Sequence, residues 1–240
     1  MLLWEGKSSW RGAVPEAMPD RNIRAILTGY DPQQGLSSNS KTGPMAQLWI
    51  LVSSVNPYES IDRGGDVLVC GSCERRPGTC KDAGCARCYV RMRAPNQTWQ
   101  AHKDASVVSR RDWPSFWLPR LGLRAGAYGD PGFLPRWLVE GLAKTSQGNM
   151  TSYTQRWRVR SLDWLKAFSM ASCRTEAEVD QALALGWRPF YSRPVGEPLP
   201  KGCVQCPAAV EAGKMTTCQR CQWCNGHSGR RAFGVSDEEH

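Results

Sequence analysis

The sequence predicts an α/β fold: a reduced or partial (β/α) barrel that carries two cysteine-rich metal-binding segments. Three observations lead to this prediction. Apolar stretches of strand length alternate with stretches of helical spacing, which is typical of parallel sheets. The chain has 240 residues, and a complete eight-unit barrel needs about 250. Cysteine is abundant, with 11 residues, and all but one of them fall into two groups.

The alternation can be followed along the chain. Strands are expected over 22–30, 45–54, 121–135, 149–157, the end of 161–172, and 188–192. Helices are expected over 96–105, 135–147 and 175–187. The last helix has the clearest signals, because Thr175 and Glu178 form a capping-box pattern and Gly186 stands at the expected stop. We divide the chain into an α/β domain, residues 1–200, which contains the first cysteine group (70–88), and a cysteine-rich segment, 201–240, packed on it.

The balance of charge favours a polyanionic partner. The formal net charge is +9 and the pI is about 9.1, so nucleic acid is the first candidate. The N-terminal stretch MLLWEGKSSW lacks the basic and apolar regions of a secretory signal, and no run of about 18 apolar residues predicts a membrane span. We therefore expect a cytoplasmic protein with no membrane partner, whose clustered thiols bind metal rather than form disulfides.

The first cysteine group consists of Cys70, Cys73, Cys80, Cys85 and Cys88. Cys80, Cys85 and Cys88 can ligate three irons of a [4Fe–4S] cluster and leave the fourth iron open. Cys70, Cys73 and Cys88 are a competing set. A four-cysteine set that adds Cys85 to these three has the C-x₂-C-x₁₁-C-x₂-C spacing of a zinc knuckle. The spacing leaves the choice among these sets, and between iron and Zn²⁺, open.

The second cysteine group closes the chain and consists of Cys203, Cys206, Cys218, Cys221 and Cys224. Each C-x₂-C pair in it lets two thiolates reach one ion. The preferred ligands, for zinc or for a [4Fe–4S] cluster, are Cys206, Cys218, Cys221 and Cys224, with His227 as a spare nitrogen ligand. Cys173 stands outside both groups and is expected to be a small buried hydrophobic residue.

Two motifs resemble those of radical S-adenosylmethionine (SAM) enzymes. CKDAGCARCY, residues 80–89, is similar to the C-x₃-C-x₂-C-aromatic signature of that superfamily, with one extra residue in the first spacing. AYGDP, residues 127–131, is similar to the Gly-Gly-Glu-Pro turn that binds the methionine end of SAM, with Asp in place of Glu. The resemblance implies that Gly129 and Asp130 hold SAM. Asp130 is also the best acidic candidate for a base or nucleophile, because barrel sites gather at the ends of strands, and Tyr128 would line the same mouth.

Longer stretches resemble a family of uncharacterised phage and prophage proteins related to the phage "gene product eighty-eight" type domains. They include SKTGPMAQLWIL, LRAGAYGDPGFLP, SYTQRW and CPAAVEAGKMTTCQRCQWC. This resemblance implies a phage or mobile-element origin and a location in the host cytoplasm. It implies no reaction.

Two further patterns point to phosphate or nucleic acid. In SSNSKTG, residues 37–43, Lys41 would supply a positive charge and Thr42 a hydrogen-bond donor to a phosphate, with a solvated loop as the alternative. The motif is not a Walker A sequence, because Ser40 precedes the lysine. The stretches 109–120 and 152–160 interleave Arg with Trp, so that guanidinium groups can grip phosphates while indoles stack on bases.

The leading hypothesis is an iron–sulfur, radical-SAM-like enzyme that acts on nucleic acid, with a second structural or auxiliary site in the C-terminal group. One alternative is a zinc-containing base transglycosylase of the deazaguanine type, which would modify DNA or tRNA with Asp130 as covalent nucleophile. The third hypothesis is not an enzyme but a zinc-stapled module that binds nucleic acid or a host protein.

Overall fold

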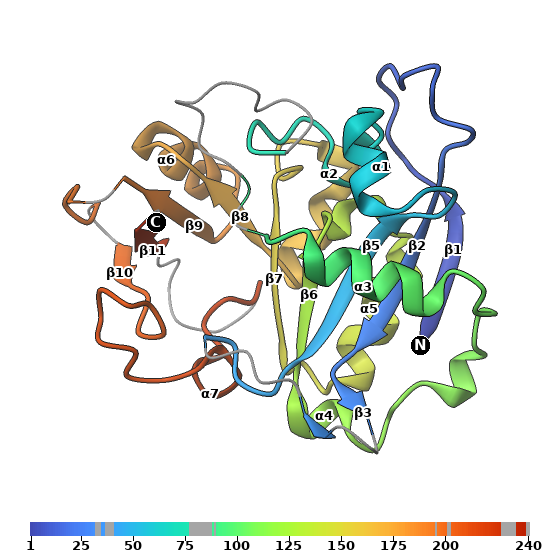
Figure 1. The fold of residues 1–240 in the computed structure, drawn as a ribbon. Helices are drawn as coiled ribbons and strands as arrows, with labels where there is room; N and C mark the ends of the chain where they lie inside the picture. Colours follow the sequence, from blue (N-terminus) through green and yellow to red (C-terminus); the bar gives the residue numbers. More distant parts are fainter. Residues whose placement is uncertain are drawn as a thin grey trace.

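A single nine-stranded sheet runs through most of the molecule (Figure 1). The structure is a computed structural model that describes residues 1–31, 35–36, 41–76, 88, 90–194, 196–200, 203–226 and 234–238. The strands of the sheet are β1 (Leu2–Lys7), β2 (Asn22–Thr28), β5 (Ala46–Val52), β6 (Leu123–Tyr128), β7 (Met150–Thr154), β8 (Met170–Cys173), β9 (Pro189–Arg193), β10 (Cys203–Gln205) and β11 (Gly234–Glu238). A separate two-stranded ribbon is formed by β3 (Tyr30–Asp31) and β4 (Gly35–Leu36).

The order of strands in the sheet is β1-β2-β5-β6-β7-β8-β9-β11-β10. The pairs β1–β2 and β2–β5 are antiparallel, and every pair from β5 to β10 is parallel. Strands β5 to β9 are therefore neighbours in the same order as in the chain, and their carboxyl ends meet at one edge of the sheet. This carboxyl edge is where α/β proteins place their ligands.

The predicted α/β class is confirmed, but the predicted barrel is not formed. The sheet is open, with β1 at one edge and β10 at the other. A barrel closes when its first and last parallel strands pair. Here the outer side of β5 is already taken by the antiparallel pair β1–β2, so no parallel strand can close the sheet at that position.

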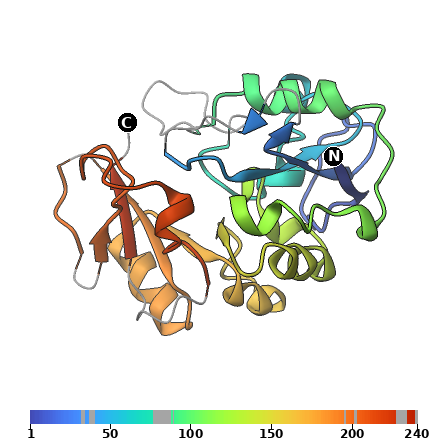
Figure 2. The same ribbon diagram turned by 90° about the horizontal axis from the view of Figure 1, so that it is seen from below.

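Helices cover both faces of the sheet. They are α1 (Pro57–Asp62), α2 (Val67–Cys70), α3 (Arg93–His102), α4 (Leu118–Leu121), α5 (Arg136–Thr145), α6 (Glu176–Ala184) and α7 (Cys218–Cys221), with 3₁₀ turns η1 (Arg110–Asp112), η2 (Pro131–Phe133) and η3 (Arg160–Ala167). Figure 2 shows α3 on one side of the strands and α5 and α6 on the other. Within the described parts of the chain, no helix is long and apolar enough to cross a membrane.

Most of the predicted elements are present. Helix α6 begins as its sequence predicts, since the Thr175 hydroxyl accepts a hydrogen bond from the Glu178 amide at 3.2 Å. Strands β1, β10 and β11 were not predicted. Strand β1 buries Leu2 and Leu3 at the edge of the sheet, and β10 and β11 extend the parallel sheet beyond β9. The C-terminal cysteine-rich segment therefore contributes two strands to the sheet as well as packing on it.

Candidate metal centres

The first cysteine group lies at the carboxyl edge of the sheet. The chain leaves β5, forms α1 and α2, and α2 ends with Cys70. The amide of Asp130, just after β6, donates a hydrogen bond to the Val69 carbonyl at 2.8 Å. This bond holds the thiol-bearing turn against the end of the neighbouring parallel strand.

Three thiols of this group lie near enough to influence one another's pKa. Burial raises the pKa of Cys70 well above its usual value, and the nearby Asp66, Cys73 and Cys88 raise it further. Burial also raises the pKa of Cys88, with Cys73 again among the contributing neighbours. We name Cys70, Cys73 and Cys88 the carboxyl-edge thiols. They are the competing set of the sequence analysis, while Cys80 and Cys85 lie outside the described residues.

Guanidinium groups surround the carboxyl-edge thiols. The Arg174 side chain, which follows β8, donates to the Cys73 sulfur at 3.4 Å and to the Glu74 carboxylate at 2.5 Å. Arg75 lies near Cys73 and Cys88 and reaches the Ser192 hydroxyl of β9 at 3.5 Å. The sequence analysis did not single out these arginines, although a signal was available, because Arg75 follows the C-x₂-C pair almost directly.

Arg76 belongs to the same surroundings. Its guanidinium group pairs with the fully buried Asp66 carboxylate at 2.6 Å. A buried carboxylate needs such a partner. Together with Arg75 and Arg174, this arginine gives the edge the positive charge that a set of thiolates needs nearby.

Tyr128 and Gly129 complete this edge of the site. The Tyr128 side chain is 4% exposed, its hydroxyl lies beside the Cys70 sulfur, and no group meets that hydroxyl with hydrogen-bond geometry. Gly129 has φ of 80°, and a Cβ there would lie 2.6 Å from the Ile50 carbonyl oxygen, so only glycine fits this turn. The predicted Gly-Asp turn therefore does sit next to the thiols.

Asp130 is engaged in structural hydrogen bonds. Its carboxylate accepts from the Gly132 amide at 2.7 Å, from the Thr154 hydroxyl at 2.8 Å and from the Gln155 amide at 2.7 Å. Burial raises its pKa, and these hydrogen bonds oppose the shift. The carboxylate caps η2 and links the ends of β6 and β7, an arrangement in which its lone pairs are already used.

The second cysteine group lies near the opposite, amino edge of the sheet. Its members line one small cavity of about 10 Å³ together with Thr151 and Ala208. The cysteines that line the cavity are Cys206, Cys218, Cys221 and Cys224. We name them the amino-edge thiols, and they are the four that the sequence analysis preferred. Burial raises the pKa of Cys224, and the other three thiols raise it further.

Backbone hydrogen bonds hold this segment to the sheet. The Cys218 amide donates to the Lys41 carbonyl at 3.0 Å, and the next amide, of Gln219, donates to the Thr42 carbonyl at 3.1 Å. The Ser152 amide of β7 donates to the Cys224 carbonyl at 3.0 Å. The backbone carbonyls of Lys41 and Thr42 therefore anchor helix α7. The contact of their side chains with phosphate stays a prediction.

The remaining cysteines are distinct from both sets. Cys203, the fifth member of the C-terminal group, lies near Cys173, whose pKa burial raises to about 12. Cys173 is fully buried, as predicted, and forms no disulfide. No disulfide is formed by Cys70, Cys73, Cys88 or Cys224 either. His227 lies outside the described residues. In the part of the chain that the structure describes, no three Cys, His, Asp or Glu side chains are arranged closely enough to form a ligand group.

The predicted Arg–Trp surfaces are only partly exposed. Trp113 and Trp157 are 5% and 1% exposed, so neither indole can serve as a stacking platform. Phe116, in contrast, is 73% exposed, and the Arg120 guanidinium lies 4.5 Å from its ring centre. The segments 113–124 and 213–226 contain no Asp or Glu.

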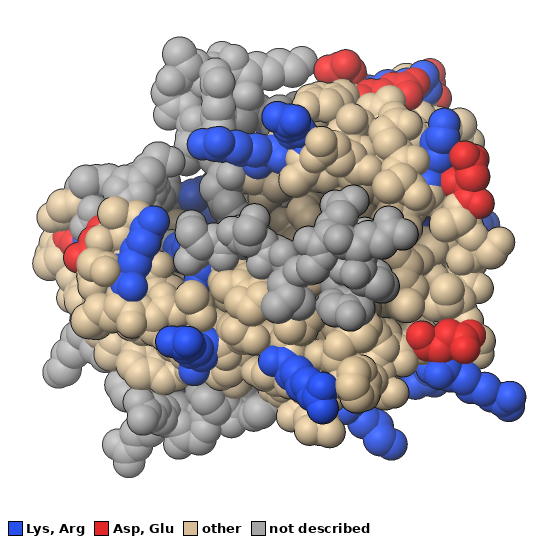
Figure 3. Space-filling view, turned by 60° about the horizontal axis from the view of Figure 1, so that its bottom comes forward, with Lys and Arg blue, Asp and Glu red and all other residues tan. Residues whose placement is uncertain are grey.

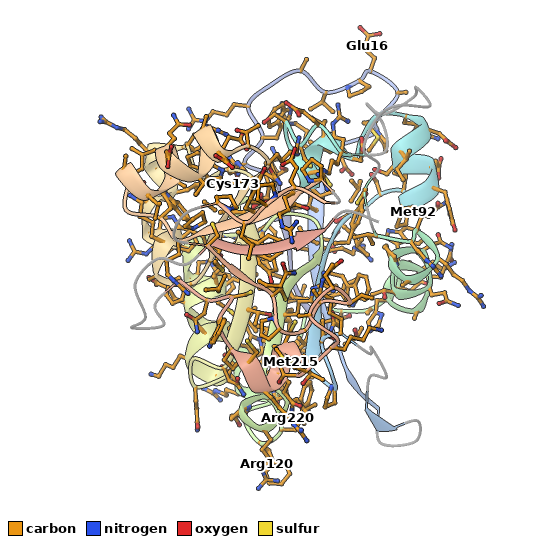
Figure 4. All side chains as sticks on the ribbon, turned by 90° about the vertical axis from the view of Figure 1, so that its left-hand side faces the viewer. Glu16, Met92, Arg120, Cys173, Met215 and Arg220 are labelled. Carbon is orange, nitrogen blue, oxygen red and sulfur yellow. The ribbon has the colours of Figure 1, made fainter. Side chains whose placement is uncertain are left out.

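An exposed basic and apolar surface surrounds Phe116. The Gln219 side chain contacts the Arg120 carbonyl at 3.1 Å, which joins α4 to α7. Figure 4 shows Met215, which is 75% exposed, near Arg220 and Arg120, at the end of the molecule opposite Glu16. Figure 3 shows Lys and Arg side chains spread over this face, with most Asp and Glu side chains at its margins.

No family model matches this chain, and neither does any curated protein or solved structure.

Proposed function

We propose that this protein is an iron–sulfur enzyme of the radical-SAM type that acts on nucleic acid. The observation that carries the proposal is that Cys88, the last cysteine of the C-x₄-C-x₂-C motif, lies with Cys70 and Cys73 at the carboxyl edge of the parallel sheet, beside the Gly129 turn. Cys80 and Cys85, the other cysteines of that motif, lie outside the described residues. Ligand sites of α/β proteins occur at this edge. Three protein ligands leave one position open for a substrate, which distinguishes a catalytic metal site from a structural one.

The residues around these thiols suit an anionic sulfur cluster. Cysteine binds iron as thiolate, and burial makes thiolates costly unless cations lie nearby. Arg174 touches the Cys73 sulfur, and Arg75 lies close to two of the three thiols. The unpartnered Tyr128 hydroxyl would gain an acceptor when Cys70 carries negative charge. A cluster held by these thiols would supply the electron for reductive cleavage of SAM, drawn from an external reductant.

The turn after β6 would position SAM rather than react. The Asp130 carboxylate is saturated with hydrogen bonds, and it fixes the turn that brings Gly129 next to the thiols. This arrangement gives less support to the base transglycosylase, because its covalent nucleophile would have to break at least three hydrogen bonds before it could attack. The substrate class rests on the net charge of +9. The Phe116–Arg120 surface lies before β6, on the side of α7, and would hold a part of the nucleic acid away from the thiols.

The proposal is tested by metal analysis of protein purified without oxygen. We expect iron and sulfide, a brown colour, and cleavage of SAM to 5′-deoxyadenosine when a strong one-electron reductant is added. Cys88→Ala should remove the iron and the SAM cleavage. Cys173→Ala, which changes a buried thiol outside both groups, should retain them. A colourless wild-type protein that contains only zinc would overturn the proposal.

Nucleic-acid binding has its own test. Phe116→Ala should weaken binding of single-stranded DNA or RNA by roughly fivefold or more, because stacking of one base contributes about 1–3 kcal/mol. Tyr58→Ala on α1, where the ring is 49% exposed, is the matched control and should bind as the wild type does. Affinity should also fall as salt rises. Equal affinity of the two variants would remove Phe116 from the binding surface.

A further inference from the structure

The amino-edge thiols have a geometry of their own, independent of the reaction proposed above. Four cysteines from two separated stretches of the C-terminal segment line a single cavity. Two of them, Cys206 and Cys224, are 5% and 7% exposed. From this arrangement we infer that Cys206, Cys218, Cys221 and Cys224 bind one Zn²⁺ ion, which fastens the C-terminal segment to the amino edge of the sheet.

The size of the cavity decides between a single ion and a cluster. Its volume of about 10 Å³ is what one water-sized sphere occupies. A [4Fe–4S] cluster contains four irons and four sulfides and needs far more room. A single ion with four thiolates is the closed, tetrahedral arrangement of structural zinc sites. The four sulfurs are not arranged as a ligand group in this structure, so the cysteine side chains would have to rotate about their Cα–Cβ bonds when the ion binds.

The structure also selects four ligands from the five cysteines of this group. Cys203 begins β10 and packs against the main hydrophobic core, close to Cys173. Helix α7 holds Cys218 and Cys221 at its two ends, and Gln222, with φ of 52°, turns the chain back so that Cys224 faces the same cavity. Cys206 arrives from the end of β10.

The segment needs such an ion because it buries little apolar surface. The side chains that it buries are small: Cys206, Ala208, Ala209 and Cys224, with the polar Asn225 beside them. Small domains without a sufficient core are commonly stabilised by a structural metal. A zinc ion here would hold α7 against Lys41 and Thr42, and Cys224 against β7.

The experiment compares two cysteines of the same group. Protein expressed with added zinc is purified under reducing conditions, and zinc per chain is measured for the wild type, Cys221→Ser and Cys203→Ser. We expect Cys221→Ser to lose one zinc per chain and Cys203→Ser to lose none. In the zinc-free wild type, and not in Cys221→Ser, added Co²⁺ should give the intense charge-transfer absorption of thiolate ligands. Equal zinc in Cys221→Ser and the wild type overturns the inference.

A second measurement identifies the atoms that bind the zinc. After the iron centre has been reconstituted, X-ray absorption at the zinc edge should show sulfur neighbours alone, at about 2.3 Å. Nitrogen or oxygen neighbours, or iron that Cys221→Ser removes together with a visible cluster, would overturn the inference. Loss of iron in Cys88→Ala with zinc retained separates this site from the centre at the carboxyl edge.

Discussion

The two cysteine groups occupy opposite edges of one sheet and differ in what surrounds them. The carboxyl-edge thiols lie beside arginines, a buried tyrosine hydroxyl and a glycine turn. The amino-edge thiols line a small cavity with small apolar neighbours. A site that has charged groups and an open ligand position suits chemistry, whereas a closed set of four sulfurs suits structure. The comparison teaches that the surroundings of a cysteine group separate these roles where the spacing does not.

The largest expected effect is a difference in stability between variants of the two cysteine groups. Cys224→Ala should lower the free energy of unfolding by about 4 kcal/mol or more, because loss of a structural metal ranks among the most destabilising changes. Cys70→Ala should cost about 1 kcal/mol but abolish SAM cleavage. Thermal unfolding and the iron content of both variants test this pair. Similar losses of stability in both variants would erase the distinction between the two sites.

The next effect concerns Asp130 and the assignment of its role. Asp130→Asn should cost about 2–3 kcal/mol, since the amide NH₂ group faces donors that the carboxylate had accepted. Asp163→Asn is the control, because Asp163 forms only an exposed pair with Lys166 and should change stability by about 0.5 kcal/mol or less. Urea unfolding measures both variants. Unchanged stability of Asp130→Asn together with lost activity would restore Asp130 as a nucleophile.

Strand β5 could be predicted because its sequence, AQLWILV, is an apolar run between turn signals. The cap at Thr175 could be predicted because its partner is three residues away. Strands β10 and β11 have only 3 and 5 residues. They are strands because β11 pairs with β9 and β10 pairs with β11, and not because of their local sequence. The predicted α/β class is present, but the sheet does not close into a barrel. Closure depends on which strand occupies each edge, and this cannot be predicted from a local sequence pattern.

The candidate sites also combine features that local sequence predicts with features that depend on long-range packing. The four amino-edge thiols were chosen from their spacing, and the structure brings these four to one cavity. Asp130 looked like a reactive acid because its partners, Thr154 at the end of β7 and Gln155 just after it, can be identified only from the packing. The contact between Arg174 and Cys73 likewise could not be predicted from the sequence, because the two residues are 101 positions apart in the chain.

The dependence of metal binding on pH is the third expected effect. Burial raises the pKa of Cys224, so this thiol is protonated at neutral pH and an arriving ion must displace the proton. Zinc affinity should therefore fall about tenfold per pH unit for each displaced proton as the pH is lowered. The free energy of unfolding of the metal-free protein should change with pH in the opposite direction. The stability contributed by the protonated thiol is lost as pH rises above the usual thiol pKa of about 8.5.

A chelator competition at several pH values measures the affinity, and urea unfolding of the metal-free protein measures the second trend. Cys224→Ala, which lacks this thiol, should lose the rise of stability towards low pH. Zinc affinity that does not change with pH would mean that the thiols are already ionised without the metal, contrary to their buried position.

The smallest effect on stability is expected from the two tyrosine hydroxyls that lie beside the thiols, Tyr128 by Cys70 and Tyr153 by Cys224. Tyr128→Phe removes a buried hydroxyl without a hydrogen-bond partner, so stability should stay within about 0.5 kcal/mol of the wild type or rise slightly. The reduction potential of the iron centre should nevertheless fall, because a donor near sulfur favours the reduced, more negative cluster. Tyr153→Phe should leave that potential unchanged, since its hydroxyl lies at the other edge. A redox titration of both variants decides whether Tyr128 belongs to the centre: equal potentials would make it a packing residue and would remove one of the features that distinguish the carboxyl edge from the amino edge.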